Sequence, residues 1–110
     1  MFVFAPSVSD KEFVRALNDA AAKGLNVRVC LAKDASAEDL AAFSDDVLTT
    51  ASIRAQLHAK TVLADRSALM VGSANFTQNS LDNNREVGAV FSSTGTLRDY
   101  ENTLLRDCKW

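Results

Sequence analysis

The sequence has one histidine, two cysteines, one proline and four glycines among 110 residues. So little proline and glycine excludes collagen-like and low-complexity chains, and 47% hydrophobic residues are typical of a single small globular domain. Two cysteines are too few for a disulfide framework, and they lack the spacing of metal ligands. Cys30 lies in an apolar run, so we expect it to be a reduced core residue. A lone histidine, His58, means that chemistry needing two imidazoles cannot be completed by one copy of the chain.

The chain also lacks an excess of positive charge and a long apolar run. Its formal net charge is −2, whereas a protein that binds nucleic acid over its whole surface is usually basic. No stretch approaches the roughly 20 apolar residues of a membrane span. Residues 1–6 are apolar but too short for a signal peptide, and no basic segment precedes them. We therefore expect a soluble, cytoplasmic protein with no signal peptide and no transmembrane segment.

The hydrophobic pattern predicts an α/β fold. Residues 2–5 are typical of a short strand that ends at Pro6, and residues 10–23 place their apolar side chains on one face of a helix. Gly24 is a typical helix terminator, and residues 27–31 are typical of a buried strand. A strand, a helix and a second strand form a βαβ unit, which favours a parallel pair.

The rest of the chain also contains both strand-like and helix-like patterns. It predicts further strands at residues 50–55, 57–64, 68–71 and 87–91, helices at 36–43 and 94–110, a turn at 65–67 and a loop at 72–84.

Polar side chains gather at one hairpin of this pattern. His58 and Lys60 are two residues apart in a predicted strand, so they project from the same face. The return strand ends at Gly72 and Ser73, with Asn75 just beyond. An imidazole, an ammonium, a hydroxyl and a carboxamide are thereby expected around one spot.

This grouping suits attack on a phosphodiester. Lys60 supplies a positive charge for the phosphate oxygens, Ser73 and Asn75 supply hydrogen-bond donors, and Gly72 allows close approach of the backbone. A neutral imidazole can attack phosphorus and form a covalent intermediate, while an acid protonates the leaving oxygen. The attacking ring also needs an acceptor for its second nitrogen, and Glu86 is a candidate.

The spacing of these residues resembles the HKD motif of the phospholipase D superfamily, His-x-Lys-x4-Asp-x6-Gly-Ser-x-Asn. The residues that match are His58, Lys60, Asp65, Gly72, Ser73 and Asn75. An Asn-x-Glu pattern ending at Glu86 and a helix–glycine–strand unit upstream extend the likeness over nearly the whole chain.

The resemblance implies a mixed β-sheet flanked by helices and a phosphodiesterase that needs no metal or other cofactor. His58 would be the nucleophile or its acid partner, and Lys60, Ser73 and Asn75 would bind phosphate. Glu86 would orient the imidazole. Asp65 is counted with His58 and Lys60 in the motif, but seven positions from His58 its side chain should face the other way and fix the turn.

Family members use two such motifs, and this chain has one. The second motif could come from a second copy, in a homodimer, or from another half of a longer chain. Family domains also open with an extra helix and strand, so an N-terminally truncated domain is a further alternative. Our main hypothesis is hydrolysis of phospholipid headgroups; the alternatives are an endonuclease that cleaves DNA or RNA as a homodimer, and a non-catalytic half-site. Metal-dependent hydrolysis is disfavoured, because one histidine and scattered carboxylates make a poor metal site.

Overall fold

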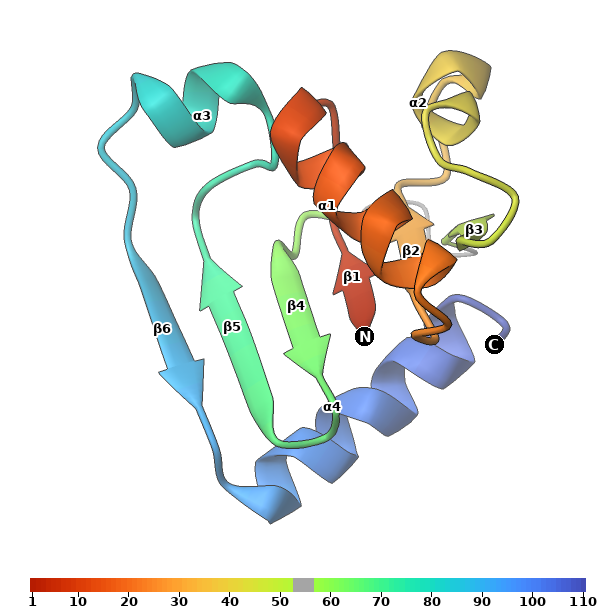
Figure 1. Cartoon of the computed structure of the whole chain (residues 1–110). Coiled ribbons are helices and arrows are strands. Elements are labelled where there is room, and N and C mark those ends of the chain that lie inside the picture. Colours follow the sequence, from red (N-terminus) through yellow and green to blue (C-terminus); the bar gives the residue numbers. More distant parts are fainter. Residues whose placement is uncertain (53–56) are drawn as a thin grey trace.

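The computed structural model describes residues 1–52 and 57–110 of the chain. Six strands form one mixed sheet in the order β3-β2-β1-β4-β5-β6 (Figure 1). The strands are β1 (Phe2–Phe4), β2 (Arg28–Leu31), β3 (Leu48–Ala51), β4 (Thr61–Ala64), β5 (Ala68–Gly72) and β6 (Gly88–Phe91). The helices are α1 (Lys11–Ala22), α2 (Ala37–Ala41), α3 (Gln78–Asp82) and α4 (Thr94–Asp107). The predicted mixed α/β sheet flanked by helices is confirmed.

The first half of the chain forms the parallel part of the sheet. β1 pairs in parallel with β2, with Val3 opposite Val29, and β2 pairs in parallel with β3. Between β1 and β2, α1 begins after Asp10, whose carboxylate accepts a hydrogen bond from the Phe13 N–H at 2.8 Å. The predicted βαβ unit is therefore present. Residues 53–55 of the strand predicted at 50–55 lie outside the described residues.

The second half of the chain is antiparallel. β4 pairs with β1 on one side and β5 on the other, and β6 forms the edge beyond β5. The strand predicted at residues 57–64 is wrong in its first half, because residues 57–60 precede β4 without strand pairing. The loop predicted at 72–84 contains α3, whose start is capped by the Thr77 hydroxyl accepting from the Ser80 N–H at 3.3 Å.

A helix packs on each face of the sheet, but the helices leave one edge of it uncovered. Leu17 and Ala21 of α1 pack on one face, against Val3 and Val29. Leu97 and Leu104 of α4 pack on the other face. Both helices lie over the β1–β2 side and the middle of the sheet, while β6 lies outside them (Figure 1). Among the described residues, no helix has the length and apolar character needed to cross a membrane.

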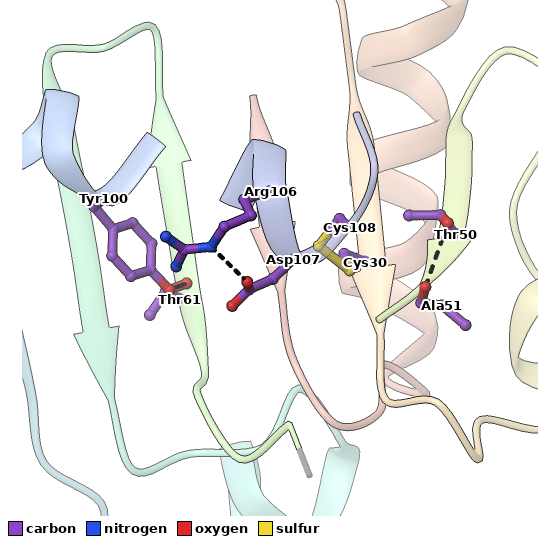
Figure 2. The surroundings of a disulfide bond; sticks show 8 residues. All are labelled: Cys30, Thr50, Ala51, Thr61, Tyr100, Arg106, Asp107 and Cys108. Carbon is purple, nitrogen blue, oxygen red and sulfur yellow. Dashed lines mark hydrogen bonds and ion pairs between the residues drawn. A yellow bond between two sulfur atoms is a disulfide. The ribbon is translucent and has the colours of Figure 1, made fainter. Parts of the chain in front are cut away.

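The two cysteines form a disulfide bond (Figure 2), so the expectation that Cys30 is reduced is wrong. Cys30 lies in β2 and Cys108 caps the end of α4, and both side chains are buried. They are 78 residues apart in sequence, and only the packing of α4 on the sheet brings them together. The bond fixes the C-terminal helix to a central strand.

Candidate functional site

The motif lies at the point in the sheet where the order of the strands changes direction. From β1 the chain runs to β2 and β3 on one side, and it then returns to β4 on the other side of β1. In open α/β sheets, ligands bind in the crevice beyond the carboxyl ends of parallel strands at such a point. His58 and Lys60 precede β4, which is antiparallel to β1, so they lie beside the carboxyl end of β1.

The His58 and Lys60 side chains are brought together although they are not in a strand. The Lys60 ammonium lies 3.2 Å from Nδ1 and 3.3 Å from Nε2 of the His58 ring, and it donates to the His58 carbonyl oxygen at 2.7 Å. Lys60 is buried, whereas His58 is exposed. The pair therefore presents an accessible imidazole with a fixed positive charge against it.

The two halves of the motif are joined through the backbone. The Gly72 N–H donates to the Lys60 carbonyl oxygen at 3.1 Å, next to the pairing of Thr61 with Val71. The hairpin thus places Gly72 and Ser73 beside the His58–Lys60 pair, as the sequence predicts.

Ser73 is held by the start of β6. Its hydroxyl donates to a carboxylate oxygen of Glu86 and accepts from the Val87 N–H at 3.1 Å, while its own N–H donates to the Val87 carbonyl at 2.9 Å. The other Glu86 oxygen accepts from the Asn84 amide at 3.3 Å. The structure therefore makes Glu86 the acceptor of the Ser73 hydroxyl proton. A phosphate that binds the Ser73 hydroxyl must replace Glu86 as that acceptor.

Gly72 allows a close approach, and the group that approaches is β6. A Cβ at Gly72 would lie 3.3 Å from the Val87 carbonyl oxygen and 3.6 Å from the Gly88 Cα. The glycine therefore lets β6 carry Glu86 up to Ser73.

Asn75 is half-buried and follows Ser73 on the segment between β5 and α3. The next residue anchors this segment, because the Phe76 carbonyl accepts from the Ser9 and Asp10 N–H groups, each at 2.9 Å. The Phe76 ring also stacks on Phe13 of α1 with 4.6 Å between centroids. Asn75 is thus positioned by contacts to the segment that links β1 to α1.

Asp65 is not brought to the other motif residues. It follows β4 and lies in the turn before β5, at the opposite end of β4 from His58, with a positive φ of 51°. Aspartate is among the residues that tolerate this conformation. The position agrees with the expectation that the side chain faces away and belongs to the turn.

Next to the motif, Thr61 points toward α4. Its hydroxyl and that of Tyr100 are 2.6 Å apart, in hydrogen-bond contact (Figure 2). Burial raises the pKa of Tyr100, because the phenolate would lose hydration, and the hydrogen bond to Thr61 opposes that effect. This contact fixes the strand that follows Lys60 to the C-terminal helix.

A cavity of about 600 Å³ opens beside His58. Its walls come from the segments that follow β1 and β2, from α2 and from Leu57. The sequence did not predict this feature, because its lining comes from segments far apart in the chain and, apart from His58, belongs to no motif. Within residues 1–52 and 57–110, no group of three or more histidine, cysteine or acidic residues could hold a metal ion.

Comparisons with known proteins agree with this geometry. The model of the family described as cardiolipin synthase, PLD-like domain, matches residues 1–108. No curated protein matches the sequence. NucT from Helicobacter pylori has a similar structure, with a TM-score of 0.80 and 19% sequence identity, over 97% of this chain and 79% of NucT.

A second similar structure is Nuc from Salmonella typhimurium, a phospholipase D family member. Its TM-score is 0.84 at 18% identity, over 96% of this chain and 74% of Nuc. These likenesses show the shared fold, and the family match covers all of the strands and helices named above. The chain belongs to the phospholipase D superfamily, in the family of cardiolipin synthase PLD-like domains.

Proposed function

We propose that this chain is a phosphodiester hydrolase that acts through a phosphohistidine at His58, with phospholipid headgroup esters as substrates. The observation that carries the proposal is the Lys60 ammonium against the His58 ring, with the Gly72 N–H donating to the Lys60 carbonyl oxygen and Ser73 next along the chain. A fixed cation beside an exposed imidazole provides an electrostatic site for a phosphate oxygen next to a nucleophile.

The reaction runs in two displacements. A ring nitrogen of His58 attacks phosphorus, a P–N bond forms, and the P–O bond to the alcohol breaks while an acid protonates the departing oxygen. Water then attacks phosphorus, the P–N bond breaks, and the same group takes the proton from water. The acid is His58 of a second copy in a homodimer, because this chain contains one histidine. A two-fold axis near the site would bring the two rings together.

Nucleic acid is the second candidate substrate, because the similar structures carry the names NucT and Nuc. The net charge of −2 disfavours it, since binding to a phosphate backbone depends on lysine and arginine. Incubation with a short-chain phospholipid and with a single-stranded oligonucleotide, both in chelator, decides between them by which one is cleaved.

The mechanism is tested with bis(para-nitrophenyl) phosphate in chelator. We expect His58→Ala to reduce turnover by at least about 10³-fold, because it removes the nucleophile. Lys60→Ala should also lower turnover strongly, whereas Lys23→Ala is a matched control at an exposed position outside the motif. Retained activity in His58→Ala would overturn the phosphohistidine mechanism.

A mixing experiment tests the shared site. Wild-type chain is combined with His58→Ala chain in increasing proportion, after unfolding and refolding together. If each site needs two histidines, the activity falls as the square of the wild-type fraction. A linear fall, or a mass in solution of 11.9 kDa rather than twice that value, would show that one copy acts alone.

The disulfide bears on the compartment. Buried disulfides form and persist in oxidising environments and are rare in the cytosol. The Cys30–Cys108 bond therefore favours an oxidising compartment over the cytoplasmic one expected from the sequence.

A further inference from the structure

Helix α4 holds the motif-bearing strand β4 at both of its ends. At the start of β4, the hydroxyls of Tyr100 and Thr61 are 2.6 Å apart (Figure 2). Beyond the other end of β4, Nε of Arg66 donates to the Glu101 carboxylate at 2.8 Å. Two consecutive residues of one helix therefore contact the two ends of this strand.

The helix is itself fixed to the sheet. Leu97 and Leu104 are buried in the core on this face of the sheet, and the Cys30–Cys108 disulfide joins the end of the helix to β2. Tyr100 lies between these anchors along the helix. Its hydroxyl is therefore held at a set position over the start of β4.

Thr61 connects the helix to the candidate site. It is the first residue of β4 and the neighbour of Lys60, and its side chain is 2% exposed. A buried hydroxyl needs a hydrogen-bond partner, and a threonine that lacks one competes for nearby backbone groups. Without the Tyr100 hydroxyl, the Thr61 hydroxyl would turn to the backbone where β4 begins.

The His58–Lys60 pair depends on this junction because it lies outside the sheet. Residues 57–60 precede β4 without strand pairing, and the Lys60 ammonium lies 3.2 Å and 3.3 Å from the two ring nitrogens of His58. The backbone of Lys60 is held by the Gly72 N–H, which donates to its carbonyl oxygen at 3.1 Å, and by the peptide bond to Thr61. A rearrangement at Thr61 would therefore move the ammonium relative to the ring.

We infer that Tyr100 is a positioning residue of the site: by satisfying the Thr61 hydroxyl, it keeps the start of β4 in place and with it the Lys60 ammonium against the His58 ring. Its effect on turnover rests on the proposed function, whereas its effect on the surroundings of the ring does not. Tyr100 belongs to no motif of the sequence, because 39 residues separate it from Thr61.

The first test is the proton NMR spectrum at fixed pH, which needs no turnover. The chain has one histidine, so the ring C–H signals of His58 are assigned directly. We expect Tyr100→Phe to shift these signals; the variant keeps the aromatic ring and loses only the hydroxyl. Glu101→Gln is the matched control, because it weakens the contact of the next helix residue with Arg66 beyond the far end of β4, and it should leave the signals in place.

A second variant separates positioning from packing. Thr61→Val combined with Tyr100→Phe leaves neither hydroxyl in place, so no buried hydroxyl remains to compete for the backbone. We expect the double variant to return the His58 signals toward those of the wild type. With bis(para-nitrophenyl) phosphate, Tyr100→Phe should lower kcat by roughly tenfold, because a small misplacement of a site group is costly, and the double variant should recover most of that loss.

Three results would overturn the inference: unchanged His58 signals in Tyr100→Phe, an equal shift in Glu101→Gln, or a shift that persists in the double variant. Each would show that Tyr100 serves the stability of the fold alone. The proposed function is decided separately, by turnover in wild type and His58→Ala. Absence of turnover in the wild type would overturn that function, and the NMR comparison would still decide the role of Tyr100.

Discussion

The two halves of the sheet differ in how well they are covered. Around β1 and β2, helices pack on both faces, and the Val29 side chain is 0% exposed. In β6 every residue is exposed, with Val90 at 70%, although the strand is entirely apolar. The residue before it, Val87, is 81% exposed.

This contrast matters because the motif spans both halves. His58 and Lys60 lie beside β1 in the covered half, whereas Ser73 and Glu86 are held together at the start of β6 in the open half. An open apolar edge strand is a surface that proteins normally pair or cover. The covered half therefore holds His58 and Lys60 against the buried core, whereas Ser73 and Glu86 depend on a strand whose residues are all exposed.

The largest predicted effect breaks the covered half at its disulfide. The double variant Cys30→Ala/Cys108→Ala should lower the free energy of unfolding by about 2–5 kcal/mol, because a 78-residue separation is no longer closed in the unfolded chain. Urea denaturation measures the change. Reduced wild type should unfold like the variant, and equal stability of oxidised wild type and variant would contradict the bond.

A matched pair of valines compares the halves directly. Val29→Ala in β2 should cost about 2 kcal/mol, since it leaves a cavity in the core, whereas Val90→Ala in β6 should cost less than about 0.5 kcal/mol. Both values come from denaturant unfolding of the purified chain. Similar costs at the two positions would mean that β6 is covered in solution, as a homodimer that buries it would require.

A further prediction concerns the boundary between the halves, at the contact of Thr61 with Tyr100. Because burial raises the pKa of Tyr100, the folded chain keeps its phenol neutral at a pH where the unfolded chain ionises. Stability from this group is fully present below the ordinary value of 10.0 and is lost as the pH rises through the higher folded value. Denaturation at several pH values above 9 should show a decline in wild type. Tyr100→Phe should weaken the fold by about 1 kcal/mol at neutral pH and flatten that decline.

Much of the fold follows from local patterns. The apolar face of residues 10–23 predicts α1, and the segments around it predict the parallel pair, because periodicity reflects which side of an element is buried. The start of β4 could not be predicted in this way. Residues 57–60 alternate apolar and polar side chains as a strand does, but Lys60 donates to the His58 carbonyl, and pairing with β1 begins at Thr61.

In the site, too, local patterns predict some features and long-range packing decides the others. The spacing of His58, Lys60 and Ser73 predicts that they lie at one end of a hairpin, and the structure joins Lys60 to Gly72, the neighbour of Ser73, at that end. The spacing did not show that Glu86 binds Ser73, which depends on the approach of β6 to Gly72.

The sequence by itself determined the family, the βαβ unit and the hairpin that carries the motif, since each depends on residues close together along the chain. Only the tertiary structure decided the Cys30–Cys108 bond, the cavity beside His58 and the exposure of β6. The physical reason is common to all three: each depends on how α4, the segments after β1 and β2, and the edge of the sheet pack in space, and no local pattern records those long-range contacts.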